Sequence, residues 1–226
     1  MKVVISLGGS VLTNELTAEH FKKYIDVVNA LAKKHKLILV IGGGRVCREY
    51  QKIGKELGAG IEERDFIGIM ATHLNASAFA SGLGNKGYLV TWKPLKDIVK
   101  EIKKNFGKKI IVCGGYDVGT SSDYDAAYLA KLVDADLLIN VSNVSGVYSE
   151  DPKVNPDAKK FDKLSHEEFL KIIKKNAQTP GEYRLFDLKA AKLIKKFKIK
   201  TILIDGNNPE EIIKAVEGQH NGTVVG

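Results

Sequence analysis

The sequence contains few of the residues that cross-link a fold or build a metal cluster. Its only cysteines are Cys47 and Cys113, and its five histidines show no spacing typical of metal ligands. Two cysteines cannot form a disulfide framework, so we expect buried thiols in a reducing compartment. The chain has no apolar run of about 18 residues, and the run at residues 1–7 is too short for a signal peptide. These absences predict a cytoplasmic protein that does not enter a membrane.

Arginine is also scarce, although the chain is basic. The formal charge is +8, from 35 lysine and arginine residues against 27 aspartate and glutamate residues. Only Arg45, Arg48, Arg64 and Arg184 are arginines. A basic chain is a candidate for binding nucleic acid. However, no aromatic residues alternate with the lysine clusters, as a base-stacking surface would require. We therefore expect the lysines to form solvated helix faces and predict no nucleic-acid partner.

The composition is that of a folded domain, because 44% apolar and 27% charged residues exclude a disordered or fibrous protein. Short β-branched runs alternate with amphipathic helical stretches. The predicted strands cover residues 3–7, 37–41, 88–91, 110–113, 137–141 and 201–204. Most of these runs are apolar without alternation, as in parallel strands covered on both faces. The 226 residues therefore predict an α/β fold, a three-layer sandwich around a mainly parallel sheet.

Local signals mark where helices begin and where the chain leaves the core. Thr17, Ser165 and Asn208 are each placed to cap a helix start. Residues 142–163 hold two prolines and few apolar runs. We expect this segment to be an excursion from the sheet, either a hairpin over a ligand or a plain surface loop.

Three glycine-rich loops follow predicted strands, at residues 8–10, 42–44 and 114–115. Ligands of open α/β sheets bind at the carboxyl ends of the strands. Glycine lets backbone N–H groups approach an anion closely, although tight strand–helix turns also use glycine for steric reasons. Three such loops on one edge favour phosphate binding. The G-x-G-x-x-G stretch at residues 82–87 ends a helix instead of following a strand, so it is not a dinucleotide motif.

These loops and several other segments resemble the amino-acid-kinase superfamily and, within it, the archaeal uridylate kinases. The matching segments are residues 7–11, 42–50, 65–76, 114–127, 143–152, 186–192 and 220–223. The glycine loops are shared across the superfamily, whereas the segment that begins at Asp65 and the short chain point to the uridylate branch. The resemblance implies the acetylglutamate-kinase-like fold and a homohexamer. It also implies transfer of the ATP γ-phosphoryl group to UMP, with Mg²⁺, in pyrimidine nucleotide synthesis.

The resemblance also implies roles for individual positions in a single domain of residues 1–226. The acceptor part would cover about residues 1–130 and the ATP part about residues 131–226. The implied ATP-binding residues are Gly9, Ser10, Gly44, Arg48, Ser142, Asn143, Tyr148 and Asp151. The implied UMP-binding residues are Gly43, Asp65, Gly115, Tyr116, Asp117, Val118, Gly119, Thr120, Ser121 and Ser122. Asp123 and Asp187 would organise the catalytic centre.

Phosphoryl transfer places simple demands on the protein, namely in-line positioning and neutralised charge on the moving group. Arg45, Arg48 and Arg184 are candidate cations, and we count Arg45 among the catalytic residues. Asp123 and Asp187 could orient those cations or hold Mg²⁺ through waters, and no residue is assigned as a dedicated metal ligand. The phosphate of UMP is already a nucleophile, so no general base is needed.

Several of these residues have simpler structural interpretations. Asp65 and Asp123 could cap helices, and Tyr148 could pack in the core. Asn75 could satisfy backbone groups of a turn. Cys47 is expected to be a core residue and not a reactive thiol.

Some positions depart from the superfamily pattern. Ser6 stands where many members have a lysine, and Ser145 stands where an aspartate is usual. Residues 179–184 replace a serine-rich run. The acceptor loop reads Tyr-Asp-Val-Gly at residues 116–119, and Asp117 would weaken binding of the UMP phosphate unless it points away. ATP use is therefore the safer expectation.

Two alternative functions remain open from the sequence. One is a superfamily kinase for another small anion, such as an acyl or isoprenoid phosphate. The isoprenoid type normally has a histidine just after the second glycine loop, where this chain has residues 45–48 without one. The other is a non-catalytic relative that senses nucleotides or stores oxyanions, against which Asp123 and Asp187 argue.

Overall fold

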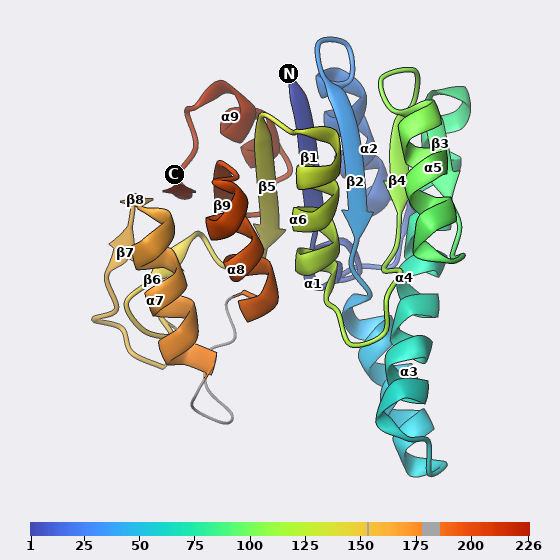
Figure 1. The fold of residues 1–226 in the computed structure, drawn as a ribbon, viewed down its shortest axis with the longest axis horizontal. Coiled ribbons are helices and arrows are strands. Elements are labelled where there is room, and N and C mark those ends of the chain that lie inside the picture. Colours follow the sequence, from blue (N-terminus) through green and yellow to red (C-terminus); the bar gives the residue numbers. More distant parts are fainter. Residues whose placement is uncertain (153, 178–185) are drawn as a thin grey trace.

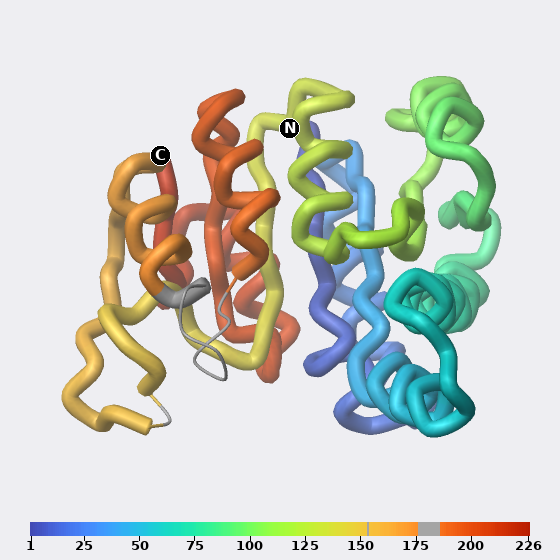
Figure 2. The backbone as a smooth tube through the Cα atoms, turned by 60° about the horizontal axis from the view of Figure 1, so that its bottom comes forward, coloured from blue at the N-terminus to red at the C-terminus, as the bar shows by residue number. Residues whose placement is uncertain are grey.

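A central eight-stranded sheet with helices on both faces forms the protein (Figures 1 and 2). The computed structural model describes residues 1–152, 154–177 and 186–226, without the side chains of residues 176 and 177. The strand order is β3-β4-β2-β1-β5-β9-β10-β8. The strands are β1 Lys2–Leu7, β2 Lys36–Ile41, β3 Gly87–Val90, β4 Ile110–Cys113, β5 Leu137–Ser142, β8 Lys163–Leu164, β9 Thr201–Asp205 and β10 Thr223–Val225. This architecture confirms the predicted three-layer α/β sandwich.

Six neighbouring strands of the sheet, from β3 to β9, run parallel to one another. In the centre, Leu7 of β1 lies beside Ile41 of β2 and Val141 of β5, so these three strands end level. The loops that follow them therefore meet at one edge of the sheet. Strand β10 is antiparallel to β9, and β8 pairs with β10 at the far side.

The buried strand residues divide between two cores, one on each face of the sheet. Val4, Ile38 and Val40 belong to the core beneath α5, α6, α7 and α8. Their chain neighbours Val3 and Leu39 belong to the core beneath α2, α4 and α9. Because both faces are covered, consecutive positions such as Val3 to Ile5 and Leu37 to Ile41 are apolar, which is the pattern seen in the sequence.

The helices begin where the sequence indicates. They are α1 Gly9–Leu12, α2 Ala18–Leu31, α3 Gly44–Glu56, α4 Ile61–Leu83, α5 Leu95–Asn105, α6 Ser122–Val133, α7 His166–Ala177, α8 Leu188–Phe197 and α9 Glu210–Glu217, with a short 3-10 turn, η1, at Gly84–Lys86. Thr17 accepts a hydrogen bond from the backbone of His20, and Ser165 exchanges hydrogen bonds with Glu168. Asn208 accepts from the backbone of Glu210. In the part of the chain that the structure describes, no helix has the length and apolar content needed to cross a bilayer.

The excursion at residues 142–163 contains a separate two-stranded antiparallel sheet, β6 Val147–Tyr148 and β7 Lys160–Phe161. This confirms that a hairpin leaves the core there. Strands β6, β7, β8 and β10 were not predicted from the sequence, because two or three residues are too few to show a strand periodicity.

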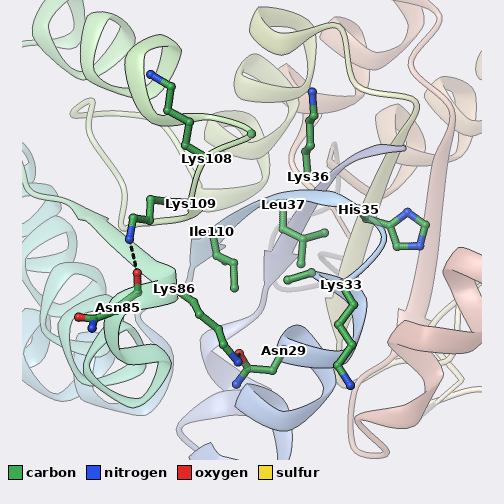
Figure 3. Close-up of a pocket in the computed structure, with 12 residues that line it drawn as sticks. Asn29, Lys33, His35, Lys36, Leu37, Asn85, Lys86, Lys108, Lys109 and Ile110 are labelled. Atoms are coloured by element: carbon green, nitrogen blue, oxygen red, sulfur yellow. Dashed lines mark hydrogen bonds between the residues drawn. The ribbon is translucent and has the colours of Figure 1, made fainter.

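Lysines gather at the opposite edge of the sheet, where β2 and β4 begin. A cavity of about 430 Å³ is lined there by Lys33, Lys36, Lys86, Lys108 and Lys109, among others (Figure 3). Lys86 donates to the side chain of Asn29, 3.3 Å away. Part of the excess positive charge therefore lies far from the edge where the glycine loops meet.

We predict that Tyr24→Phe destabilises the fold. The side chain of Tyr24 is 0% exposed, and its hydroxyl donates to the backbone oxygen of Gly206 at 2.8 Å. The variant keeps the ring but removes the only donated proton, so we expect a loss of about 1–2 kcal/mol in the free energy of unfolding. Urea denaturation measures this loss. Tyr50→Phe is the matched control, because Tyr50 is exposed; equal midpoints for the two variants would contradict the prediction.

Candidate active site

The glycine loops after β1 and β2 lie directly against each other at the carboxyl edge of the sheet. The N–H of Gly42 donates to the oxygen of Leu7, and the N–H of Gly8 donates to the oxygen of Val141, each at 2.9 Å. The loops after β1, β2 and β5 are thereby joined backbone to backbone. This arrangement follows from the level ends of the three parallel strands.

Steric demands explain several of these glycines. Gly44 has a φ of +61°, and a Cβ there would lie 2.1 Å from Oγ1 of Thr13. A Cβ on Gly9 would lie 2.1 Å from the backbone nitrogen of Gly44. Real Cβ atoms do not tolerate such contacts, so Gly9 and Gly44 are required for the two loops to pack together. Their presence therefore does not by itself demand a phosphate ligand.

Side chains from neighbouring elements hold this loop pair. Thr13 donates to the oxygen of Gly9 at 2.7 Å and accepts from the N–H of Arg45 at 3.2 Å. Asn75 on α4 donates to the oxygens of Gly42 and Gly43 at 2.9 and 3.2 Å. The simple interpretation of Asn75, that it satisfies backbone groups of a turn, is thus confirmed.

Asp123, at the start of α6, lies over the middle of the sheet. Its Oδ1 accepts from Oγ of Ser6 on β1 at 3.1 Å and from Nδ2 of Asn140 on β5 at 2.7 Å. Burial raises the pKa of Asp123 to about 6, although Ser6 and Asn140 act in the opposite direction. Ser121 is the residue that caps α6, so Asp123 is not a helix cap.

Asp187 lies next to Asp123 and connects it to α8. Besides burial, the charge of the Asp187 carboxylate raises the pKa of Asp123. The carboxylate of Asp187 caps α8 by accepting from the N–H of Ala190 at 2.7 Å. The structure therefore brings the two predicted catalytic aspartates together.

Both aspartates are engaged in hydrogen bonds within the protein. Oδ1 of Asp123 accepts from two side chains, and Oδ1 of Asp187 caps a helix. Among the described residues, no three histidine, cysteine, aspartate or glutamate side chains form a metal-ligand cluster.

The loop between β4 and α6 borders a cavity of about 200 Å³ that opens between α3 and α4. Its lining residues are Gly43, Cys47, Gln51, Asp65, Gly68, Ile69, Thr72, Gly115, Asp117, Thr120, Ser121, Ser122 and Asp125. Most of the residues implied to bind UMP are in this set. The set holds three carboxyl groups, of Asp65, Asp117 and Asp125, and no described basic side chain lines the cavity.

Helix α4 fixes the loop that forms one wall of this cavity. Thr72 accepts from the N–H of Gly115 at 2.7 Å, and Nε2 of His73 lies 2.8 Å from the oxygen of Gly115. Asp65 accepts from the N–H of Gly119 at 3.2 Å. Asp65 is inside α4, whose cap is Gly60, so the helix-cap interpretation of Asp65 is wrong.

Three other residues implied to bind UMP do not line the cavity. Tyr116 is buried, and its ring packs edge-on against Tyr128. Val118 and Gly119 are exposed at the tip of the loop.

Cys47 does line the cavity, and burial raises its pKa, so it is a thiol and not a reactive thiolate at neutral pH.

Known proteins share this architecture and sequence. The model of the Amino acid kinase family matches residues 1–205. A uridylate kinase from Archaeoglobus fulgidus is 40% identical over 225 residues, covering 100% of both chains. One from Methanothermobacter thermautotrophicus is 35% identical, covering 100% of this chain and 99% of its own. The crystal structure of the Archaeoglobus fulgidus enzyme superimposes with a TM-score of 0.88 at 39% identity, covering 100% of both chains.

The chain belongs to the amino acid kinase family. A UMP kinase structure from Ureaplasma parvum, at 22% identity, shares the fold with a TM-score of 0.83, covering 100% of this chain and 98% of that chain. Members of this family with a lysine at the position of Ser6 would place a cation beside Asp123. In this chain two neutral donors, Ser6 and Asn140, occupy that place.

The residues implied to bind ATP lie at the ends of β1, β2 and β5 and on the hairpin. Ser10 is half-buried in α1, and Ser142 forms a turn with Val144. Asn143 is exposed. The hydroxyl of Tyr148 lies 2.7 Å from Oγ of Ser145, the serine that replaces the usual aspartate. Tyr148 is half-buried, as is Asp151.

The predicted cations lie at the surface of α3. Nε of Arg45 lies 3.4 Å from Glu49, one turn later, with both side chains largely exposed. Arg48 is exposed as well. Arg184 and residues 179–184 lie outside the described residues.

Sequence reasoning missed four residues that hold the cavity loop. Thr72, His73 and Asp125 contact its backbone or side chains, and Lys189 of α8 donates to the oxygen of Gly119 at 2.7 Å. The only sequence signal was polar residues inside helical segments, which is also the pattern of a solvated face.

We predict that Gly44→Ala destabilises the protein far more than Gly58→Ala. Both glycines have positive φ, but a Cβ on Gly58 meets nothing within 4 Å, whereas a Cβ on Gly44 meets Thr13 and Gly9. Gly58→Ala should lower the free energy of unfolding by about 1 kcal/mol, from backbone conformation alone. Gly44→Ala should lower it by the same amount and by a further ~3 kcal/mol, because the two loops must separate to make room for the Cβ. Chemical denaturation of both variants checks this, and equal losses would show that the loop contact carries no strain.

Proposed function

We propose that the chain is a UMP kinase, which transfers the γ-phosphoryl group of ATP to UMP and forms UDP and ADP. The observation that carries this proposal is the cavity beside the start of α6, in a chain similar over its full length to uridylate kinases. The loop that borders the cavity leads directly into Asp123, so an acceptor held there lies next to the paired aspartates.

The two substrates occupy different halves of one domain in this proposal. UMP binds in the part formed by about residues 1–130, against Gly43, Asp65 and the loop of residues 115–122. ATP binds in the part formed by about residues 131–226, with contributions from Gly9, Ser10, Gly44 and Arg48. Ser142, Asn143, Tyr148 and Asp151 contact its adenosine part. The carboxyl edge of the sheet runs through both halves, from β4, β2 and β1 to β5 and β9, which supports in-line transfer along it.

The chain acts on the reaction by positioning and by charge. The Asp123 and Asp187 pair orients the donors around the phosphates, and no general base is required because the UMP phosphate is itself the nucleophile. Mg²⁺ enters as part of the MgATP substrate, where it neutralises phosphate charge, since Asp123 and Asp187 are already engaged. The side chains of Arg45 and Arg48, exposed on α3, turn toward the phosphates when the nucleotides bind and neutralise part of their charge.

A cytoplasmic homohexamer completes the proposal. Large apolar side chains are exposed along α3 and α4 and the turn between them, including Leu57 at 82% and Leu74 at 62%. Isolated apolar side chains are ordinary, but a group on one helix pair suits contact with a second copy. Light scattering after size exclusion should give six times the 24.8 kDa chain mass, and a monomer mass would contradict the hexamer.

The acceptor is tested by a coupled assay with MgATP and UMP, CMP, dUMP or AMP. We expect ADP formation with UMP at the highest kcat/KM, and UDP as the product. Acyl and isoprenoid phosphates, the acceptors of other kinases of this superfamily type, form a second arm. The absence of UDP at millimolar UMP would overturn the proposal. Turnover of a second-arm phosphate would then identify another superfamily kinase, whereas nucleotide binding without turnover would indicate a non-catalytic relative.

The same assay tests whether phosphoryl transfer depends on Asp123 and Asp187. Asp123→Asn and Asp187→Asn remove a charge each while keeping an oxygen acceptor, so we expect folded proteins with kcat lower by roughly a hundredfold or more. Asp26→Asn is the control, because Asp26 is an exposed aspartate on α2. Unchanged turnover in the Asp123 variant would remove the proposed role of the aspartate pair.

A further inference from the structure

Asp125 is a buried acid in the acceptor cavity that has no role in the mechanism above. It lies one turn into α6, and only 1% of it is exposed. An isolated charged carboxylate at such a position is strongly disfavoured, because burial removes its hydration. Its partners therefore decide whether the group is charged.

Those partners span the whole acceptor loop. Oδ2 of Asp125 accepts from the N–H of Tyr116 at 3.3 Å, and the backbone oxygen of Asp125 accepts from the Tyr116 hydroxyl at 3.0 Å. Oδ1 of Asp125 lies 3.0 Å from Oγ1 of Thr120. One residue thus contacts both the first and the last part of the segment 116–120.

The hydroxyl of Thr120 indicates which oxygen carries a proton. Oγ1 of Thr120 lies 2.7 Å from the backbone oxygen of Asp117 and 3.0 Å from Oδ1 of Asp125. A threonine hydroxyl has one proton to donate, and both neighbours are acceptors when Asp125 is ionised. If Asp125 is protonated at Oδ1, its O–H donates to Thr120, and Thr120 donates to Asp117. All three groups are then satisfied.

The charges near Asp125 favour the same state. Burial raises the pKa of Asp125, and the carboxylates of Asp117 in the loop and Asp123 on α6 act in the same direction. The hydrogen bonds from Thr120 and Tyr116 lower it, and the net result is a pKa of about 7. The balance leaves the group largely neutral below pH 7.

Groups from the other elements do not reverse this balance. Burial raises the pKa of Cys113 on β4 and of Cys47 on α3, so both are neutral thiols. Burial lowers the pKa of His73 on α4, which is a neutral imidazole at pH 7. Asp65 on α4 adds a further carboxylate to the cavity, and the ammonium of Lys189 on α8 is engaged with Gly119 outside the cavity lining.

We propose that Asp125 is a positioning residue for the acceptor: as a neutral carboxylic acid it donates to Thr120 and holds residues 116–120 in the shape that receives an acceptor phosphate. This inference rests on the proposed function, because it assigns the cavity to the phosphorylated acceptor. A neutral Asp125 adds no negative charge to a cavity that Asp65 and Asp117 already line.

Ionisation of Asp125 has two consequences for the acceptor. Thr120 can no longer satisfy both Asp117 and Asp125, so the turn at residues 117–120 loosens. A third negative charge also enters the cavity, where it repels a phosphate dianion. Affinity for the acceptor therefore falls as the pH rises through about 7. The transfer step is affected less, because Asp123 interacts with Asp125 through charge and shares no hydrogen bond with it.

The test compares Asp125→Asn with the wild type across the pH range from about 6 to about 8. The amide of the variant donates to Thr120 and accepts from Tyr116, as the neutral acid does, but it cannot ionise. We expect the wild-type KM for UMP, divided by that of the variant, to rise about tenfold over this range, with no matching change in the kcat ratio. Taking the ratio cancels the titration of UMP itself.

Control variants and a second measurement make the outcome decisive. Asp26→Asn should keep the wild-type pH profile, and Asp125→Ser provides a second neutral residue should the asparagine variant not fold.

Thermal unfolding of the wild type and of Asp125→Asn gives a measurement that needs no substrate. Native Asp125 keeps its proton above the unfolded pKa of about 4, so the wild type should lose stability relative to Asp125→Asn as the pH rises from about 4 to 7.

The possible results separate the two proposals. A wild type that forms UDP with the same KM profile as both neutral variants overturns the role of Asp125 and leaves the UMP kinase intact. A wild type that forms no UDP overturns the proposed function and this inference with it. A KM ratio that rises with pH, with a flat kcat ratio, supports both.

Discussion

The carboxyl edge of the sheet depends on a backbone contact that only glycine permits. The loops after β1 and β2 touch where Gly9 meets Gly44, with no room for a Cβ on either residue. Because β1 and β2 end level, this contact sets the distance between the loop on the ATP side and the start of α3. Gly43, next to this contact, lines the cavity between α3, α4 and the loop before α6, so the shape of the cavity depends on the same packing.

Much of the fold and the grouping of the loops could be predicted from the sequence. Continuous apolar runs such as residues 37–41 identify covered parallel strands, and parallel strands bring their carboxyl ends to one edge. The reason for the glycine at position 44 could not be predicted, because its neighbour Thr13 comes from another loop. The proposed role of Asp125 could not be predicted either, since an acid in the first turn of a helix usually stabilises the helix by interacting with its dipole. These features depend on contacts distant in the chain, for which a single sequence holds no periodic signal.

The groups that surround Asp123 are neutral or acidic. Burial raises the pKa of Asp123 and the charge of Asp187 acts in the same direction, whereas the hydrogen bonds from Ser6 and Asn140 lower it without supplying a positive charge. In the proposed mechanism, the cations that neutralise the phosphates therefore come from the metal carried by the nucleotide and from the arginines of α3.

The backbone of Gly119 connects two helices. Its N–H donates to Asp65 of α4, and its oxygen accepts from Lys189 of α8. These helices belong to the two proposed substrate halves, so a hinge motion between the halves must lengthen one of the two hydrogen bonds. The Gly119 amide proton is protected from exchange by its hydrogen bond to Asp65. Its hydrogen-exchange rate would therefore report relative motion of the two proposed halves without any added label.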